Sequence, residues 1–208
     1  MNIRSLQQSH PWHGVLPGPD APKVVTCYIE LVPTDTVKYE VDKVTGLLKV
    51  DRPQKYSNLC PMPYGFIPRT LCDTAVAERA RASGAANVTA GDHDPMDICV
   101  LCERPMDRGG ILLAARPIGG LRMIDKDEAD DKIIAVLVDD AAFGSFQDIA
   151  DVPQAMVDRL RHYFLTYKEI PGASVPRVSI TEIYGAAEAR AVIAASFTDY
   201  EAFFRSSI

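Results

Sequence analysis

Three aspartates, Asp92, Asp94 and Asp97, lie within six consecutive positions of the sequence. They stand just before an apolar run, Ile98 to Leu101, which has the pattern of a buried strand. Carboxylates this close repel one another unless a cation lies among them, and their oxygens suit a hard divalent metal. Asp and Pro also favour turns, so an acidic surface turn explains this segment equally well when it is taken alone.

A second acidic segment runs from Asp125 to Lys132 and reads Asp-Lys-Asp-Glu-Ala-Asp-Asp-Lys. It also leads directly into an apolar run, Ile133 to Val138, with the pattern of a strand. Two carboxylate-bearing loops, each next to a strand, favour a metal site made from both segments.

Polar and apolar residues alternate along a predicted strand, so that Lys38, Glu40 and Asp42 share one face. A strand whose polar face meets solvent gives the same alternation. If the face instead borders a wet cavity, Lys38 would meet an anionic ligand and Glu40 a metal-bound water. The pattern is compatible with both arrangements.

Basic residues and tyrosines near these segments are candidates for an anion site. Arg can grip a phosphate through two hydrogen bonds, Lys supplies a point charge, and a Tyr hydroxyl donates without adding charge. Tyr64 follows the stiff stretch Pro61-Met62-Pro63, which could present its hydroxyl to a pocket. Taken singly, each basic residue fits an ordinary surface charge better than a site. The candidates are Lys38, Arg52, Lys132, Tyr167 and Lys168.

Motifs for other chemistries are absent or incomplete. The sequence has no P-loop, no GxSxG elbow and no HExxH. A calcium-binding EF-hand is disfavoured, because Met96 replaces an oxygen ligand and Asp97 stands where the sharp turn needs Gly. The five cysteines favour reduced thiols. Cys99 and Cys102 have CxxC spacing within a predicted strand, so we expect two small core residues, with a metal role as the minor alternative.

Composition limits the partners. The chain has 208 residues, with 28 acidic and 22 basic side chains and a net charge of −6. This charge disfavours non-specific nucleic-acid binding, which depends on neutralising phosphates. We expect no membrane span, and the N-terminus lacks the layout of a secretory signal, so a cytoplasmic protein is the default expectation.

The elements that must position these residues are mostly short strands separated by Gly turns. Residues 1–22 contain four prolines and predict an extended arm over the surface or a neighbouring subunit. Turns are expected at Gly109-Gly110 and Gly119-Gly120, and a hairpin about Gly46. This pattern favours an antiparallel barrel or sandwich over an alternating βαβ fold. The predicted strands are 24–31, 36–42, 47–52, 98–103, 111–117, 121–124 and 132–138.

Helices are expected in the C-terminal part of the chain. Asp151 is the predicted N-cap of a helix that begins near Pro153 and ends near Ile170. A second helix is predicted from Ala186 to Phe204. The Ala-rich segment 74–90 is compatible with helix and loop, and we interpret it as an insertion outside the barrel. No linker or repeat interrupts the chain, so a single domain over 1–208 is expected.

Together these features resemble the soluble family I inorganic pyrophosphatases, and the resemblance extends from about Pro11 to Phe204. Its most specific part is the DxDPxD motif from Asp92 to Asp97. The form of the second acidic loop suggests a bacterial subtype. Further matches are Ile29-Glu30, Lys38-Tyr39-Glu40, Val50-Asp51-Arg52, Tyr64-Gly65, Asp125 through Asp130 to Lys132, and Tyr167-Lys168.

The resemblance implies an α+β fold, with a five-stranded OB-like antiparallel barrel flanked by two or more helices. It also implies hydrolysis of pyrophosphate to two orthophosphates with several Mg²⁺ ions, for which Mn²⁺ or Zn²⁺ are potential substitutes, and a homo-oligomer. By position, Asp94 would be the general base that accepts a proton from the attacking water. The implied metal ligands are Asp92, Asp97, Asp125 and Asp130, with Glu30 and Glu40 acting through metal-bound waters. The implied substrate-binding residues are Lys38, Arg52, Tyr64, Lys132, Tyr167 and Lys168.

The chain departs from the family pattern at one stretch. Cys60 and Pro63 stand where members often carry Tyr and Asn. The implied metal ligands are unaffected, so we expect activity to persist. An oligonucleotide-binding barrel and a phosphohydrolase of nucleotides or polyphosphate are the competing functional hypotheses.

Overall fold

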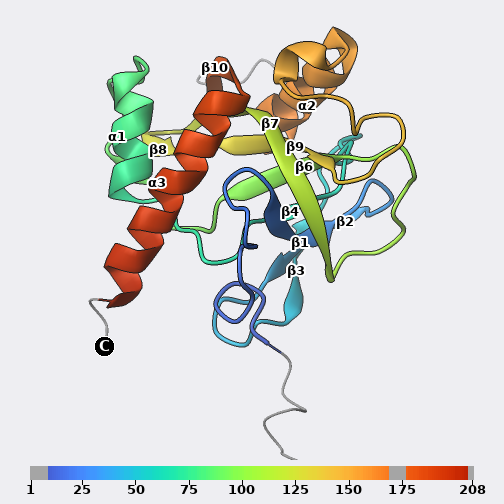
Figure 1. Ribbon diagram of the computed structural model, residues 1–208, viewed down its shortest axis with the longest axis horizontal. Coiled ribbons are helices and arrows are strands. Elements are labelled where there is room, and N and C mark those ends of the chain that lie inside the picture. The colour runs from blue at the N-terminus through green and yellow to red at the C-terminus, as the bar shows by residue number, and fades with distance from the viewer. Residues whose placement is uncertain (1–8, 169–176, 206–208) are drawn as a thin grey trace, which may run out of the picture.

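The computed structural model describes residues 9–168 and 177–205. Five strands, β1, β4, β6, β9 and β7, pair in that order, and β7 pairs back with β1 to close a ring (Figure 1). This ring confirms the predicted five-stranded, OB-like barrel. The short strands β5 and β8 and the longer β10 extend the sheet beside β7. The strands are β1 (Val25–Leu31), β2 (Val37–Val41), β3 (Leu48–Pro53), β4 (Tyr64–Phe66), β5 (Ala90–Gly91), β6 (Asp97–Leu101), β7 (Ile111–Asp125), β8 (Glu128–Ala129), β9 (Lys132–Leu137) and β10 (Val178–Gly185).

One pairing in the ring is parallel. Strands β6 and β9 run in the same direction, with Asp97 opposite Lys132. The other four pairings in the ring are antiparallel, as predicted. Parallel neighbours need a long connection, which β7 provides here because it runs back along β9 on its other side. The first residues of β6 and β9, and the loops before them, therefore meet at the same end of the barrel.

The predicted hairpin is confirmed and forms a separate two-stranded sheet of β2 and β3. Its turn closes at Gly46, whose φ of 73° lies in the left-handed region that favours glycine. A hydrogen bond from the backbone N–H of Val41 to Glu30 Oε1, 2.6 Å long, ties the hairpin to β1. The hairpin is thereby held against the barrel beside the end where β6 and β9 begin.

The turn predicted at Gly119-Gly120 is wrong, because both glycines lie inside the continuous strand β7. A Cβ atom at Gly120 would come within 2.4 Å of the Tyr184 ring, and one at Gly119 within 2.6 Å of Ile149 and of the Tyr184 carbonyl oxygen. These glycines allow β10 and the 149–151 turn to pack directly on the strand. They serve close packing instead of a change in chain direction.

Within residues 9–168 and 177–205, three α-helices cover the barrel: α1 (Thr74–Ala82), α2 (Gln154–Thr166) and α3 (Ala186–Arg205). Figure 1 shows α1 beside α3, while α2 lies at the opposite end of the sheet. The segment compatible with helix or loop thus contains a helix, and Val76, Ala77 and Ala80 are fully buried in the core. Helix α3 matches its predicted range.

The predicted start of α2 is shifted. Asp151 does not cap α2; its side chain accepts hydrogen bonds from the backbone N–H groups of Gln147 and Asp148 in a preceding 3-10 turn. Pro153 occupies the N-cap position of α2. Within the described residues α2 ends at Thr166, and the predicted end near Ile170 lies outside them, as do residues 1–8 of the predicted arm.

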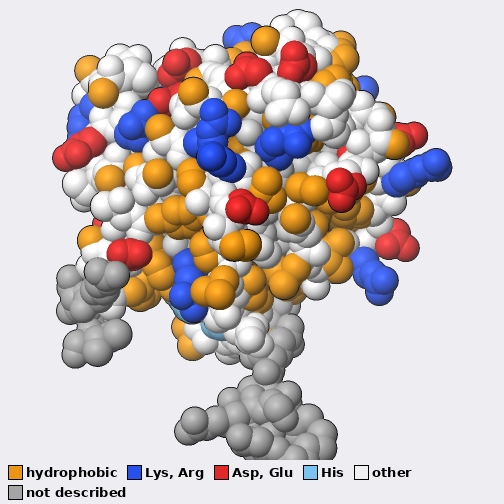
Figure 2. All heavy atoms as spheres, viewed as in Figure 1, with side chains coloured by type: hydrophobic (Ala, Val, Ile, Leu, Met, Phe, Trp, Pro, Cys, Tyr) orange, Lys and Arg blue, Asp and Glu red, His pale blue; other side chains and the backbone are white. Residues whose placement is uncertain are grey.

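Two main clusters of buried apolar side chains fill the molecule, one between the barrel and α1 with α3, the other between the barrel and α2. Cys99 is fully buried, as predicted, but Cys102 lies beyond the end of β6 and is partly exposed, so its core assignment is wrong. On the face seen in Figure 2, apolar side chains gather across the middle, between scattered charges. None of the helices in the described part of the chain is long and apolar enough to cross a bilayer.

Candidate active site

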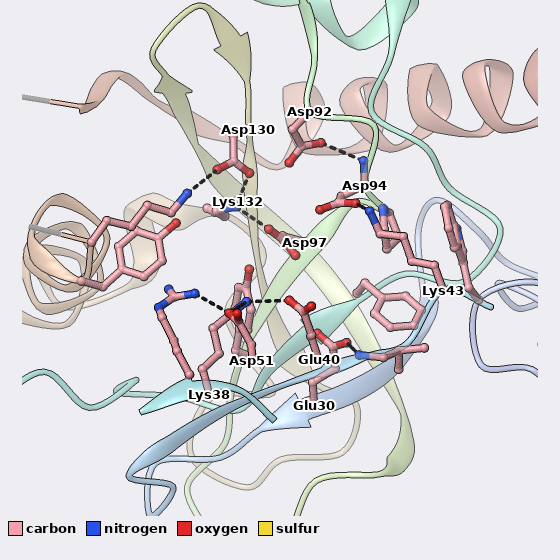
Figure 3. A pocket seen from close by; sticks show the side chains of 18 of the residues that line it. Glu30, Lys38, Glu40, Lys43, Asp51, Asp92, Asp94, Asp97, Asp130 and Lys132 are labelled. Carbon is pink, nitrogen blue, oxygen red and sulfur yellow. Dashed lines mark hydrogen bonds and ion pairs between the residues drawn. The ribbon is translucent and has the colours of Figure 1, made fainter. Parts of the chain in front are cut away.

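A pocket of about 410 Å³ opens at the end of the barrel where β6 and β9 begin. Figure 3 shows carboxylates on both of its sides, from the two acidic loops on one side and from β1 and the β2–β3 hairpin on the other. Every residue predicted for the site lines it, except Asp125. The lining residues are Trp12, Glu30, Lys38, Glu40, Val41, Lys43, Asp51, Arg52, Lys55, Tyr64, Phe66, Asp92, Asp94, Pro95, Asp97, Asp130, Lys132, Tyr167, Lys168 and Arg177.

The first acidic loop, residues 92–97, is fixed through its backbone. Cys72 donates its backbone N–H to the carbonyl oxygen of Asp94 at 2.8 Å, and its own carbonyl oxygen accepts from His93 at 3.0 Å. The backbone N–H of Met96 donates to Thr70 Oγ1 at 2.8 Å. His93 takes a left-handed conformation, with φ of 58°, which turns the chain between two aspartates. This neutral framework holds the three carboxylates without using their charge.

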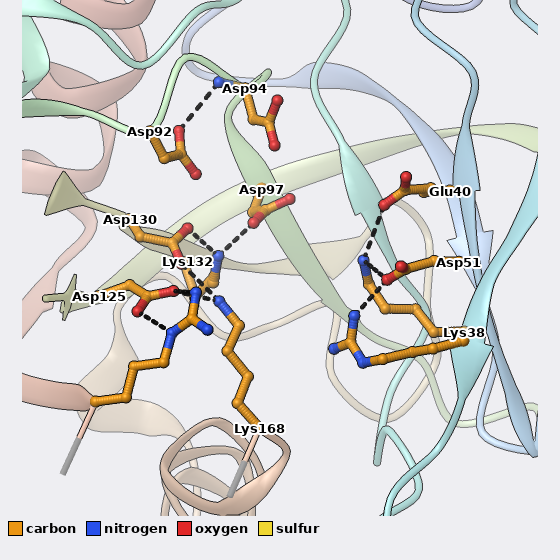
Figure 4. Close-up of polar contacts among 12 residues, drawn as sticks. Lys38, Glu40, Asp51, Asp92, Asp94, Asp97, Asp125, Asp130, Lys132 and Lys168 are labelled. Atoms are coloured by element: carbon orange, nitrogen blue, oxygen red, sulfur yellow. Dashed lines mark hydrogen bonds and ion pairs between the residues drawn. The ribbon is translucent and has the colours of Figure 1, made fainter. Parts of the chain in front are cut away.

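The second acidic loop, residues 125–132, meets the first through Lys132. The Lys132 ammonium group contacts both Asp97 Oδ2 and Asp130 Oδ1 (Figure 4). Burial alone would lower the pKa of Lys132, but Asp130 and Asp97 raise it well above its usual value. A single cationic nitrogen thus reaches one carboxylate from each loop.

On the side of the pocket formed by the two acidic loops, carboxylates outnumber the neighbouring cationic side chains. Burial, and then the charge of Asp130, raise the pKa of Asp92 well above its usual range. Asp92 forms no ion pair with any described residue; its Oδ1 accepts a 3.1 Å hydrogen bond from the Asp94 backbone N–H. Burial raises the pKa of Asp130 as well, and Lys132 opposes that effect.

This donor set fits Mg²⁺. Its oxygens are hard ligands, and the position of the Lys132 ammonium between Asp97 and Asp130 shows that a cation is accommodated there. Among the described side chains, no three His, Cys, Asp or Glu residues stand ready as a preformed cage for one ion.

The hairpin supplies the opposite wall. Lys38 Nζ contacts Asp51 Oδ2 at 3.0 Å and Glu40 Oε2 at 3.3 Å, and Arg52 also contacts Asp51. Glu30 on β1 lies beneath them, and burial raises its pKa to about 8 despite the hydrogen bond from Val41. Alternation along β2 therefore does bring Lys38 and Glu40 to a polar cavity.

Asp125 does not line the pocket, but it holds two residues that do. Its carboxylate accepts from Lys168 Nζ at 2.5 Å and from Arg177 Nε at 2.7 Å. Burial would raise the pKa of Asp125, but these hydrogen bonds lower it. Lys168 Nζ also lies 3.9 Å from Asp130 Oδ2, which connects Asp125 to the centre of the site.

Two tyrosines provide neutral donors. Tyr64 and Tyr167 are 8% and 6% exposed, and burial raises the pKa of both phenols above the usual value. Both hydroxyls therefore keep their proton at neutral pH. Arg52 Cζ lies 5.8 Å from the centre of the Tyr167 ring, which links the hairpin wall to the end of α2.

Several lining residues had no predicted role. Lys43, at the hairpin tip, contacts Asp94 Oδ1. Asp51 belongs to the Val50-Asp51-Arg52 motif that supports the resemblance, and this motif could have marked it. Trp12, Lys55 and Arg177 lie far from the acidic motifs in sequence, and no local pattern indicates them.

Comparison with known proteins gives a consistent result. The family model described as inorganic pyrophosphatase matches residues 27–201. The chain is 50% identical over 200 residues to an inorganic pyrophosphatase of Chlamydia caviae, covering 94% of this chain and 93% of the relative. It is 39% identical over 200 residues to the soluble inorganic pyrophosphatase of Oryza sativa subsp. indica, covering 96% and 83% of the two chains. The crystal structure of inorganic pyrophosphatase from Thermus thermophilus superposes with a TM-score of 0.77 at 30% identity, over 93% of this chain and 99% of that one. The chain therefore belongs to the inorganic pyrophosphatase family.

Proposed function

We propose that this protein hydrolyses inorganic pyrophosphate to two orthophosphates in a Mg²⁺-dependent reaction. The observation that carries the proposal is the meeting of Asp97 and Asp130, from two separate loops, around one cationic nitrogen. Basic side chains surround that point on the remaining walls of the pocket. Family membership supports pyrophosphate as the substrate.

Asp92, Asp97 and Asp130 would hold the activating ions, and Asp125 with Asp130 an ion that arrives with the substrate. Bound Mg²⁺ would neutralise phosphoryl oxygens and lower the pKa of the attacking water. Glu30 and Glu40 would orient water molecules at the opposite wall, where Glu40 lies beside Lys38.

The cationic and phenolic side chains would bind the two phosphoryl groups. Lys38 and Arg52 approach from the hairpin, and Lys132, Tyr167 and Lys168 from the far wall, with Tyr64 as a further donor. Fixed positive charge on both sides would stabilise the charge that moves to the leaving phosphate. The opposed walls suit a small substrate with an anionic group at each end.

Asp94 would accept the proton of the attacking water on its carboxylate. Its side chain is 46% exposed, so the proton can pass on to solvent. Lys43, at the hairpin tip, contacts the same carboxylate.

Measurement of phosphate release from pyrophosphate, with and without Mg²⁺, tests the proposal. We expect turnover only with Mg²⁺, and a loss of at least ~100-fold in Asp97→Ala and in Asp130→Ala. Asp127→Ala is the matched control, because Asp127 is an exposed carboxylate of the same acidic loop that does not line the pocket. Normal turnover in folded Asp97→Ala protein would refute the site assignment, and faster cleavage of ATP or tripolyphosphate would refute the substrate assignment.

We further propose a cytoplasmic homo-oligomer. Apolar side chains gather across the middle of the face seen in Figure 2, and this patch supports association through that face. Light scattering coupled to size-exclusion chromatography tests the oligomeric state. A monomer at all concentrations would refute it.

A further inference from the structure

Behind the second acidic loop lies a buried ionic network that the proposed mechanism does not use. Arg122 on β7 is fully buried and donates from Nη1 to Asp131 Oδ2 and from Nη2 to Glu188 Oε1, both at 2.7 Å. The Tyr184 hydroxyl donates to the same Asp131 oxygen at 2.9 Å, and its ring lies 4.8 Å from Arg122 Cζ. Glu188, on α3, is further paired with Arg79 on α1.

Asp131 stands between two residues of the active site. Successive side chains of extended backbone point to opposite sides, and the contacts follow this rule. Lys132 contacts Asp130 and Asp97 in the pocket, whereas Asp131 contacts Arg122 and Tyr184 behind it. The backbone of these three residues is thus held from the rear at its central position.

Stability alone does not explain these charges. A buried ion pair loses hydration energy that offsets much of its attraction, and apolar side chains of similar size often do as well. Two atoms of the pair, Arg122 Nε and Asp131 Oδ1, have no hydrogen-bond partner within the described part of the chain. What the pair provides is a fixed direction for the Asp131 side chain, and so for the backbone on either side of it.

We propose that Asp131, clamped by Arg122 and Tyr184, is a positioning residue that sets the orientation of Asp130 and Lys132 for metal and phosphate binding. This inference rests on the proposed function of the pocket. It adds a residue that touches neither substrate nor metal and acts through its sequence neighbours.

Titration of Mg²⁺ alone into the protein, followed by calorimetry and by the fluorescence of the single tryptophan, Trp12, tests the clamp without turnover. We expect Asp131→Asn to weaken Mg²⁺ binding about tenfold, as removal of an outer partner of a metal ligand does. The matched control is Glu188→Gln, which removes a carboxylate at the same 2.7 Å distance from the same guanidinium. We expect it to lower the unfolding midpoint while Mg²⁺ binding stays within about twofold.

Equal Mg²⁺ affinity in Asp131→Asn and wild type would overturn the proposal, and so would equal weakening in both variants, which would indicate general loosening. If Asp131→Asn does not fold, Tyr184→Phe removes only the hydroxyl bond to Asp131, and we expect about threefold weaker Mg²⁺ binding. Unchanged binding there would also overturn it. Absence of phosphate release by the wild type would instead refute the proposed function, and the Mg²⁺ titrations would still report on the clamp.

Discussion

The two acidic loops meet in one pocket but are held by different forces. The backbone of loop 92–97 is fixed by neutral hydrogen bonds: Met96 donates to the Thr70 hydroxyl, and Cys72 donates to Asp94 and accepts from His93. Loop 125–132 is fixed by charged side chains that pair with its carboxylates: Lys168 and Arg177 with Asp125, Lys132 with Asp130, and Arg122 with Asp131. The first loop has no Lys or Arg of its own: Asp94 and Asp97 pair with Lys43 and Lys132 from outside it, and Asp92 forms no ion pair with any described residue. The second loop contains a counter-charge of its own in Lys132.

This difference separates two tasks. A loop with excess negative charge and a rigid backbone is suited to attract cations from solution. A loop whose carboxylates already hold lysines and arginines is suited to place those cations where an anionic substrate binds.

The largest effect is expected at Asp94 in the first loop. Asp94→Asn should lower kcat by ~1,000-fold, because it removes the proposed proton acceptor and leaves the backbone unchanged. Mg²⁺ affinity measured by calorimetry should stay within about twofold of wild type, in contrast to Asp97→Ala. Retention of more than about a tenth of the wild-type kcat would remove Asp94 from this role, and Asp127→Asn controls for loss of an acidic charge.

Opposite effects on stability are expected from neutralising one carboxylate in each loop, with EDTA present. Asp92→Asn should stabilise the metal-free protein by about 1 kcal/mol, since it removes a carboxylate that is buried and also repelled by Asp130 and Asp97. Asp125→Asn should destabilise it by about 1–2 kcal/mol, because Lys168 and Arg177 lose their partner.

Urea unfolding measures both changes. If the free energy of unfolding changes in the same direction in both variants, the two loops do not differ in how their carboxylates affect stability. Adding Mg²⁺ should raise the free energy of unfolding more in the wild type than in Asp92→Asn, because the variant lacks a proposed metal ligand.

The neutral framework of the first loop can be weakened at Thr70. Thr70→Val keeps the shape but leaves the buried backbone N–H of Met96 without its acceptor, which should cost about 1–3 kcal/mol. Phosphate release should fall too, because residues 92–97 lose an anchor. Thr198→Val, at an exposed hydroxyl on α3, is the control and should change stability by less than about 0.5 kcal/mol. An equal loss of stability in Thr70→Val and Thr198→Val would show that the hydrogen bond from Met96 to Thr70 does not stabilise the fold.

The smallest effect concerns pH. Burial, followed by the nearby charges of His10 and Arg69, lowers the pKa of His13, whose Nδ1 lies 2.9 Å from the Tyr200 hydroxyl. A lowered pKa means that the folded state resists protonation, so this contribution is complete above the ordinary value of 6.5 and is lost as pH falls below it. His13→Asn should therefore lose less stability than wild type between pH 7 and 5. His162→Asn, at an exposed position of α2, should follow the wild-type profile; no difference between the two variants would exclude His13 as the cause.

Much of the site follows from local sequence, and some of it does not. The DxDPxD motif, the second acidic loop and the alternation along β2 predicted Asp97, Asp130 and Lys38, and the structure places them in one pocket. Lys43 and Arg177 were missed because a lone basic residue on a turn or beside a strand carries no periodic signal. The strand β10 was also missed, although Val178, Ile180 and Ile183 give it a partly alternating pattern.

The sequence by itself determined which residue types gather before each strand and which face of each element is apolar, because these depend on neighbours a few positions apart. Only the tertiary structure decided that β6 and β9 run parallel, which brings Asp97 beside Lys132. It also decided that Gly119 and Gly120 lie within a strand and that Asp131 faces Arg122. Periodicity fixes the side of a strand on which a residue lies, but the direction and identity of the neighbouring strand depend on packing between distant segments.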